Sequence, residues 1–287
     1  MSAPIHIALT FDDNFWAPAY AVMRSICLFT KRRGDLVFHL LHRPLTDEHR
    51  ADLKAIESEF RARLVWYDLD HSPLFADIAA RMPQNKRLSN IVYARLVIDR
   101  FVDPSIARIL YLDCDLLVRA PIEALYETDL EGHPIAAVRD TLGPFIVGGR
   151  DLRNNRDLFD IADPYFNAGV LLIDLDRWRQ AKLLDRLEAM FADGTMDRIY
   201  YDQDFLNLTF KHDWLHLAPT WNVIDARHAH EGLDLNIMHY TSARKPWQLV
   251  SNVAFRRIYR HVMTNELFYR YMRHRLKRRL RRLVGRA

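Results

Sequence analysis

Two aspartates one residue apart, Asp113 and Asp115, directly follow an apolar run, 109–112, that reads as a buried strand. Burying an unpaired carboxylate is costly, so two together need a partner. Ligands bind at the carboxyl ends of strands in open α/β sheets, and carboxylate oxygens suit Mg²⁺ or Mn²⁺ carrying a phosphate. The pair therefore indicates a metal–diphosphate site. A solvated turn at the end of a strand is an equally simple alternative.

Polar residues also end the first predicted strand, where Thr10, Asp12 and Asn14 occur within five positions. An ordinary helix cap would explain them. If this strand and 109–112 belong to one parallel sheet, however, their polar ends lie along the same edge. An amide and a carboxylate placed there can pair with a nucleobase and a ribose.

Two later segments carry groups suited to a sugar. Asn167 and Ala168 lead into the apolar run 168–173, where small residues allow close approach by a ligand. Asp202 and Gln203 open an amphipathic segment, and such amides and carboxylates bind sugar hydroxyls. A turn before a core strand, and acids that complement a helix N-terminus, are the alternative interpretations.

An imidazole and an ammonium follow another apolar strand. His239 ends that strand, and Lys245 comes six residues later, directly before a proline. Histidine can bind Mn²⁺, and lysine can neutralise a departing phosphate. A lone histidine is more often a core or surface residue, but this one accompanies the acidic clusters.

The hydrophobic pattern predicts the scaffold for these groups. Short apolar runs alternate with amphipathic segments, without a fixed repeat or low-complexity linker, which is typical of an α/β sheet. Pro18 and the acids after Thr46 mark two helix starts. We expect strands at 5–11, 36–41, 64–67, 109–112, 135–138 and 168–173, and helices at 18–29, 46–60, 90–99, 176–191 and from 201 onward.

Length and composition narrow the class of protein. With 287 residues, 49% hydrophobic and 27% charged, the chain can bury a full core and is not disordered. No apolar run approaches the roughly 18 residues that cross a bilayer, and residues 1–6 do not resemble a secretion signal, so we expect a cytosolic protein. Cys27 and Cys114 are too few for a disulfide framework, in agreement with a reducing compartment.

Charge is concentrated at the C-terminal end. From Arg256 to Ala287, 12 Lys and Arg stand against Glu266 alone, a net +11, whereas the remainder carries 29 basic and 36 acidic residues, a net −7. Apolar residues recur there at helical spacing: Phe268, Met272, Leu276, Leu280 and Leu283. This pattern predicts a basic amphipathic helix on an anionic membrane surface. A helix packed back on the body is the alternative, and binding to nucleic acid would leave the apolar stripe unused.

Four motifs occur in order: Tyr-Leu-Asp-x-Asp at 111–115, Phe-Asn-Ala-Gly-Val-Leu-Leu-Ile at 166–173, Asp-Gln-Asp at 202–204, and a histidine followed by Lys-Pro-Trp within 239–247. With these motifs the chain, from about residue 5 to 247, resembles the retaining glycosyltransferase family 8. That family contains bacterial lipopolysaccharide galactosyl- and glucosyltransferases and glycogenin. The segment around Arg95 also resembles the family's helix whose arginine reaches the donor sugar.

The resemblance implies a GT-A type fold, a mixed and mostly parallel sheet flanked by helices, and roles for individual residues. Asp113, Asp115 and His239 would bind Mn²⁺, or Mg²⁺, on the donor diphosphate. The other implied donor contacts are Thr10, Asp12 and Asn14 at the nucleoside, Ser242 and Lys245 at the phosphates, and Arg95, Asn167, Ala168, Asp202 and Gln203 around the hexose. Gln203, Asp202 and Lys245 would act in catalysis. Because an amide is a poor nucleophile, a front-face mechanism is favoured over a covalent one.

One position departs from the family pattern. Ser242 stands where the family has glycine; serine keeps the backbone N–H but disfavours positive φ, so the phosphate clamp should differ in shape. The segment 140–150 has the composition of a mobile loop, where we expect acceptor or lid contacts.

Together these observations predict a catalytic domain over 1–250 and a basic tail over 251–287. We expect transfer of glucose or galactose from a UDP-sugar to a saccharide acceptor, such as lipopolysaccharide or another lipid-linked glycan, at the cytoplasmic face of the membrane and without nucleic acid. Two alternatives remain open. A haloacid dehalogenase type phosphohydrolase would leave His239, Lys245 and Gln203 without roles, and a nucleic-acid-binding protein would rest on the tail alone.

Overall fold

Apolar runs form the strands of a mixed sheet, as predicted. The structure is a computed structural model that describes residues 3–83, 89–140, 157–160, 163–199, 201–283 and 285. Within them, a seven-stranded sheet has the order β3-β2-β1-β4-β7-β6-β8. The first four of these are parallel, and β7 runs antiparallel to both β4 and β6. The strands are β1 (Ile5–Phe11), β2 (Leu36–His42), β3 (Arg63–Asp68), β4 (Arg108–Leu112), β6 (Ile135–Arg139), β7 (Phe166–Asp174) and β8 (Leu215–His216).

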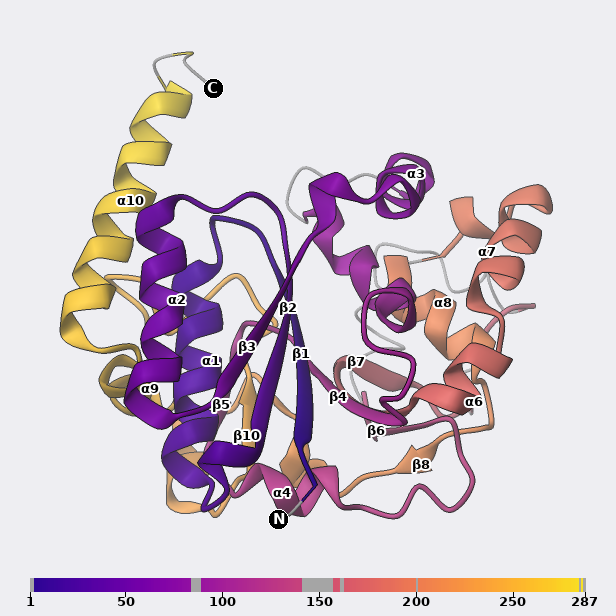
Figure 1. The fold of residues 1–287 in the computed structure, drawn as a ribbon, viewed down its shortest axis with the longest axis horizontal. Helices are drawn as coiled ribbons and strands as arrows, with labels where there is room; N and C mark the ends of the chain where they lie inside the picture. Colours follow the sequence, from indigo (N-terminus) through magenta and orange to yellow (C-terminus); the bar gives the residue numbers. More distant parts are fainter. Residues whose placement is uncertain are drawn as a thin grey trace.

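Helices cover both faces of this sheet (Figure 1). Along β1, Ile7 and Leu9 enter one hydrophobic core and Ala8 enters the other, because successive side chains of a strand point to opposite faces. The first core includes residues of α1 (Trp16–Phe29), α2 (Asp47–Phe60), α9 (Arg256–Met263) and α10 (Asn265–Leu283). The second includes residues of α3 (Pro73–Arg81), η3 (Asn90–Arg100), α6 (Leu175–Gln180), α7 (Leu183–Ala192) and α8 (Tyr201–Thr209).

A second, smaller sheet completes the described fold. Its order is β5-β10-β9, with β5 (Leu116–Val118) antiparallel to β10 (Ile237–His239) and β9 (Val223–Ile224) parallel to it. This pairing brings the end of β10 beside the turn between β4 and β5, two regions more than 100 residues apart in sequence. The remaining short helices are η1 (Arg33–Asp35), η2 (Leu69–His71), α4 (Ile122–Tyr126), η5 (Thr195–Asp197), η6 (Pro219–Trp221) and η7 (His228–Gly232).

Two predicted helices differ from expectation. The segment predicted as a helix over 90–99 is a 3₁₀ helix interrupted at Val97, whose φ is −121° and ψ is 20°. The helix predicted over 176–191 is divided in two, because Lys182 adopts a left-handed conformation with φ 49° at the start of α7. The apolar spacing continues across that break, so periodicity alone could not locate it. The predicted helix start at Thr46 is confirmed, since its side chain accepts the N–H of His49.

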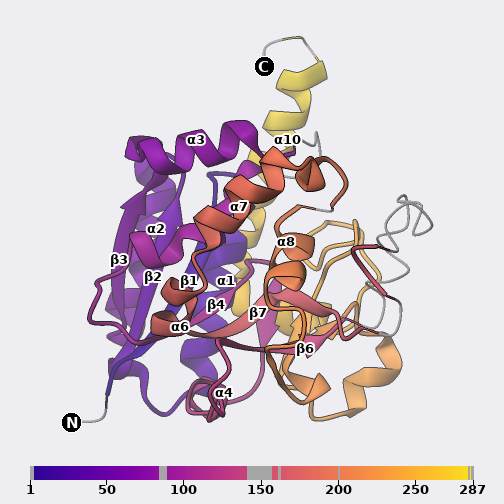
Figure 2. The same cartoon turned by 90° about the vertical axis from the view of Figure 1, so that its right-hand side faces the viewer.

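The C-terminal helices belong partly to the body. Tyr259 of α9 and Phe268 of α10 are fully buried in the same core as α1. The core therefore extends past residue 250, where we predicted the catalytic domain to end. Beyond Tyr271 most side chains of α10 are exposed, and this end of the helix extends past the rest of the fold (Figures 1 and 2).

Candidate active site

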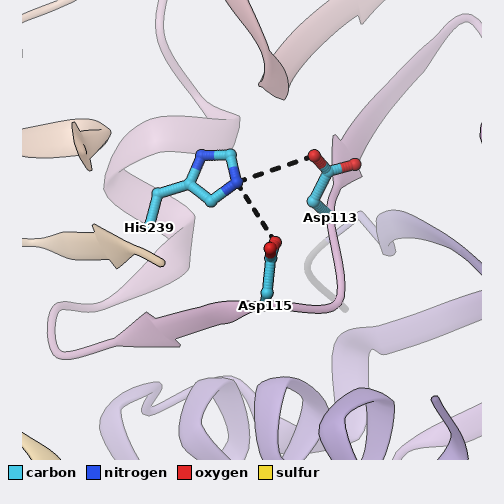
Figure 3. A group of neighbouring side chains, drawn as sticks. All are labelled: Asp113, Asp115 and His239. Atoms are coloured by element: carbon cyan, nitrogen blue, oxygen red, sulfur yellow. Dashed lines mark ion pairs between the residues drawn. The ribbon is translucent and has the colours of Figure 1, made fainter. Parts of the chain in front are cut away.

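Two adjacent parallel strands bring the predicted polar groups to one edge of the sheet. β1 pairs with β4, and Asp113 and Asp115 directly follow β4. The carbonyl of Asp115 accepts the N–H of Tyr240 (3.0 Å), which places His239 opposite the aspartates. Nε2 of His239 lies 3.1 Å from Oδ1 of Asp115 and 3.7 Å from Oδ2 of Asp113 (Figure 3).

The spacing of these three side chains fits a divalent cation. One ligand atom from each lies within 4.8 Å of the others. Octahedral ligands about 2.1 Å from an ion stand about 3 Å apart when adjacent, so small movements would bring these atoms into a coordination shell. Carboxylate and imidazole ligands suit Mn²⁺, and Mg²⁺ favours the oxygens.

Gly169 of β7 makes room for this cluster. A Cβ on Gly169 would lie 2.2 Å from Cε1 of His239 and 2.7 Å from Oδ2 of Asp113. The sequence suggested that small residues here admit a ligand, but it is the site's own side chains that approach the Gly169 backbone. The missing side chain therefore permits the positions of two of the three candidate metal ligands.

A chain of amides orients the ring of His239. Its Nδ1 lies 3.0 Å from Oδ1 of Asn222, and Nδ2 of Asn222 donates to Oδ1 of Asn167 (2.9 Å). Burial lowers the pKa of His239, but Asp115 and Asp113 outweigh this effect, and the net result is a raised pKa. With Nδ1 donating to Asn222, Nε2 of the neutral ring faces the aspartates and can bind a metal. Asn222 lies in none of the predicted motifs.

Lys245 contacts Asp115, one of the three candidate metal ligands. Its Nζ donates to Oδ2 of Asp115 (2.8 Å) and to the carbonyl of Tyr240. Burial raises the pKa of Asp115, but the charges of Lys245 and His239 outweigh burial and hold this pKa well below its usual range. The carboxylate is therefore ionised, and the predicted histidine, lysine and aspartates lie together.

Buried Arg95 links two acidic groups of the site. Its Nε lies 2.5 Å from Oδ2 of Asp202, and its Nη2 lies 3.1 Å from Oδ1 of Asp113. A third contact runs from Nη1 to the carbonyl of Ala168 (2.6 Å). Burial and the nearby Asp113 raise the pKa of Asp202, while Arg95 opposes the shift. Composition alone would place this arginine at the surface; only the resemblance indicated its role.

Gln203 connects α8 to the beginning of β7. Its Oε1 accepts from the N–H of Ala168 (3.1 Å) and from Nδ2 of Asn167 (3.2 Å). Its Nε2 donates to Asp140 (3.3 Å) and to the hydroxyl of Tyr165 (3.2 Å). The side chain is thus held in one orientation next to the Asn167 and Arg95 groups that were predicted to surround the hexose.

Thr10 is linked to Asp113 through Tyr111, the first residue of the Tyr-Leu-Asp-x-Asp motif, to which the sequence assigned no role. Its Oγ1 lies 2.9 Å from the hydroxyl of Tyr111, which donates to Oδ1 of Asp113 (2.8 Å). The sequence could have indicated the contact between Tyr111 and Asp113, because residues two apart on a strand point to the same side.

The remaining predicted donor contacts lie around the cluster. The N–H of Asn14 donates to Oδ1 of Asp12 (2.9 Å), and the carbonyl of Asn14 accepts from the hydroxyl of Tyr271 (2.8 Å). The N–H of Ser242, which was expected to face phosphate, donates instead to Oδ1 of Asp225 (3.2 Å). Of the predicted loop over 140–150, only Asp140 lies within the described residues.

Several bacterial proteins are similar in sequence. Glycosyltransferase GlyA of Streptococcus pneumoniae is 29% identical over 260 residues, which cover 88% of this chain and 34% of GlyA. The chain thus spans about a third of the length of that relative. A lipopolysaccharide 1,2-glucosyltransferase of Escherichia coli is 25% identical over 274 residues, covering 88% of this chain and 77% of the relative. General stress protein A of Bacillus subtilis is 23% identical, with coverages of 91% and 93%.

Solved structures and a family model agree with these matches. The galactosyltransferase LgtC, crystallised with donor and acceptor sugar analogues, superposes with a TM-score of 0.73 at 24% identity over 90% of this chain and 95% of LgtC. This likeness shows that the fold is of the GT-A type, as predicted. The model described as glycosyl transferase family 8 matches residues 6–250, and it supports neither the phosphohydrolase nor the nucleic-acid-binding alternative. The chain therefore belongs to glycosyl transferase family 8.

Proposed function

We propose that the protein transfers glucose or galactose from a UDP-sugar to a saccharide acceptor, with Mn²⁺ as cofactor and with retention of anomeric configuration. The observation that carries the proposal is the convergence of Asp113, Asp115 and His239 within 4.8 Å, with Lys245 hydrogen-bonded to Asp115. A divalent cation held there would neutralise the charge that develops on a departing diphosphate.

Residues of the chain complete the proposed donor site. Lys245 contacts the phosphate that leaves, and its bond to Asp115 sets its position before the donor binds. The nucleoside binds at Asp12 and Asn14, and the Tyr271 hydroxyl holds the Asn14 carbonyl. We assign the remaining donor contacts to Thr10 acting through Tyr111, Ser242, Arg95, Asn167, Ala168, Asp202 and Gln203.

Retention follows in this proposal from a front-face reaction. Gln203 lies near the anomeric carbon, opposite the leaving group, with its amide oxygen already accepting two hydrogen bonds. An oxygen so occupied, on a group that is a weak nucleophile, favours positioning over a covalent intermediate. The departing phosphate oxygen then takes the proton of the attacking acceptor hydroxyl, and Lys245 stabilises the charge that remains on the diphosphate.

The acceptor is proposed to be lipid-linked, at the cytoplasmic face of an anionic membrane. No helix among the described residues is long and apolar enough to cross a membrane. On α10, however, Leu276 and Leu280 are 59% and 51% exposed. At about 100° per residue they lie about 140° and 180° around the helix from buried Tyr271, so they face away from the body. The basic tail around them suits anionic lipid headgroups.

Donor hydrolysis, screened over a panel of nucleotide sugars with Mn²⁺, tests the enzymatic part of the proposal. We expect hydrolysis of UDP-glucose or UDP-galactose that EDTA abolishes and Mn²⁺ restores. Asp115→Asn should abolish both turnover and UDP-dependent Mn²⁺ binding while circular dichroism stays that of the folded protein. Asp129→Asn, an exposed aspartate remote in sequence from the motifs, is the control. Full activity in EDTA, or full activity of Asp115→Asn, would contradict the proposal.

A further inference from the structure

A cavity of about 220 Å³ lies between the proposed donor site and the C-terminal helix. On the body side it is lined by Asn14, Phe15 and the segment around Lys245 and Trp247. The rings of Phe15 and Trp247 meet edge to face, with centroids 5.8 Å apart. Lys245 lines this cavity and also contacts Asp115, so the cavity and the candidate metal ligands are neighbouring parts of one region.

One face of α10 forms the opposite wall. Tyr271, His274, Arg275 and Arg278 all line the cavity, and their spacing of three, four and seven residues places them on one side of a helix. Tyr271 fixes this side to the body: its hydroxyl donates to Asn14, and its ring packs edge to face on Trp16 at 5.0 Å. Helix α10 therefore packs against Asn14, one of the two residues proposed to bind the nucleoside.

The charges around the cavity favour an anion. Arg275 and Arg278 contribute two guanidinium groups, and the carbon of the Arg275 guanidinium lies 5.7 Å from the ring centre of Tyr271. Burial lowers the pKa of His274, so that ring is neutral near pH 7. Among the nearby acids, Asp13 contacts His49 (2.7 Å) and Asp12 accepts the N–H of Asn14 (2.9 Å), while Asp115 pairs with Lys245 of the cavity itself (2.8 Å).

The size of the cavity limits its ligand. Pockets that enclose a whole drug-sized ligand measure roughly 300–1,000 Å³, so about 220 Å³ suits a smaller group. Arginine forks match the oxygens of phosphate in two parallel hydrogen bonds. A phosphate or diphosphate group satisfies both the size and the charge.

We infer that Arg275 and Arg278 of α10, together with Lys245, form a phosphate-binding pocket that makes the C-terminal helix part of the substrate site. The inference rests on the proposed function only in that Lys245 also serves the departing phosphate. The bound phosphate comes either from a soluble nucleotide or from a lipid headgroup. In both cases one face of α10 binds phosphate next to the donor, and the opposite face carries the exposed leucines.

Binding of inorganic pyrophosphate to the full-length protein, measured by calorimetry in EDTA at fixed ionic strength, tests the pocket without the metal site. Arg275→Gln/Arg278→Gln should weaken binding about tenfold or more, because charge-assisted bonds are lost. The matched control is Arg273→Gln/Lys277→Gln, which removes the same charge from exposed positions of the same helix. Thermal melting verifies that both variants fold. No binding by the wild type, or equal affinity in the two variants, overturns the inference.

Vesicle sedimentation identifies the source of the phosphate. Vesicles of phosphatidylcholine with and without phosphatidic acid are sedimented with each of the two variants. If the headgroup fills the pocket, Arg275→Gln/Arg278→Gln loses more binding to the anionic vesicles than the control does. If a soluble nucleotide fills it, the two variants bind vesicles equally while their pyrophosphate affinities differ. Failure of every nucleotide sugar in the hydrolysis screen would reject the proposed function and leave the pyrophosphate result intact.

Discussion

Gly169 shows how a residue without a side chain can determine the chemistry of a site. The space next to its Cα holds the ring of His239 and the carboxylate of Asp113, and a methyl group there would meet the ring at 2.2 Å. Neither partner can withdraw freely: His239 is buried and bonded to Asn222, and Asp113 is held by Arg95 and Tyr111. A substitution must therefore displace at least one candidate metal ligand.

Gly169→Ala should reduce Mn²⁺-dependent donor hydrolysis by about 100-fold, since displacement of a reacting geometry by about 1 Å can cost that factor. Gly34→Ala is the matched control, because a Cβ there meets no atom within 4 Å. Hydrolysis rates and Mn²⁺ affinity of the three proteins decide the outcome. Wild-type Mn²⁺ affinity in Gly169→Ala would show that the cluster does not hold the metal.

Gln203 permits a second prediction at the scale of one residue. Because we place its amide next to the reacting ring and away from the nucleotide, Gln203→Ala should lower kcat roughly tenfold or more, with UDP affinity almost unchanged. Gln180→Ala, an exposed glutamine at the end of α6, should change neither quantity. Steady-state kinetics and UDP titration separate the two effects. A parallel loss of UDP affinity would show that Gln203 contacts the nucleotide and not the sugar.

At the scale of elements, the buried strand β2 carries a histidine whose burial makes the folded protein less stable as the pH falls. His39 is 2% exposed, and its ring nitrogens lie 2.9 Å from Tyr67 and 2.9 Å from His6. Burial, then the nearby His6 and Arg63, lower the pKa of His39 to about 3. The folded protein thus keeps this ring neutral where the unfolded chain, with a pKa near 6.5, takes up a proton.

The stability that depends on neutral His39 is fully present above about pH 6.5 and is lost as the pH falls from there toward 3. The titration of His39 should lower the free energy of unfolding of the protein by about 2 kcal/mol between pH 7.5 and 5.0. His39→Gln should lower that pH-dependent loss by a similar amount in urea unfolding, whereas His71→Gln, with a side chain 85% exposed, should not. The same pH dependence in His39→Gln and wild type would exclude His39 as the cause.

Helix boundaries are also decided at this scale. The pattern of apolar residues predicted the longer strands β1, β2, β3, β4, β6 and β7, because burial of one face requires a fixed period. It missed the short strands β5, β8 and β9 and the helices α3 and α4. It did not reveal the break at Lys182 or the 3₁₀ geometry of Asn90–Arg100, since both preserve apolar contact with the core. The N-cap at Thr46 was predictable because a cap is a local hydrogen bond.

At the scale of the whole molecule, α10 has a buried beginning and an exposed end. Removing the entire tail after residue 251 would expose the core around Tyr259 and Phe268, so truncation cannot separate anchoring from folding. Substitution of the outward leucines can. Leu276→Gln/Leu280→Gln should weaken binding to anionic vesicles about tenfold or more, since each leucine contributes on the order of 1 kcal/mol at a membrane interface.

In the same variant, hydrolysis of the donor in solution should stay at the wild-type rate, because neither leucine lines the cavity next to Lys245. Leu233→Gln/Leu249→Gln, which changes two exposed leucines outside α10, is the matched control. Vesicle sedimentation with and without anionic lipid measures the effect. Equal binding by wild type and Leu276→Gln/Leu280→Gln would show that this face is not the membrane contact.

The sequence by itself determined which groups could do chemistry. Asp113 and Asp115 were recognisable because they directly follow an apolar strand of the parallel sheet, where ligands bind. His239 and Lys245 were recognisable because one ends another apolar strand and the other comes six residues later. The resemblance added Arg95, which no local pattern distinguishes from a surface arginine. The basic, apolar-striped character of the tail was likewise present in its composition and spacing.

Only the tertiary structure decided how these groups are held. Asn222 orients His239, and Tyr111 joins Thr10 to Asp113, through contacts between segments far apart in the chain. The requirement for glycine at 169 and the pairing of the Ser242 N–H with Asp225 arise in the same way. Periodicity reports which face of an element is buried, whereas side-chain contacts depend on which elements pack together. That is also why the sequence could predict a basic helix but not which of its faces lies against the donor site.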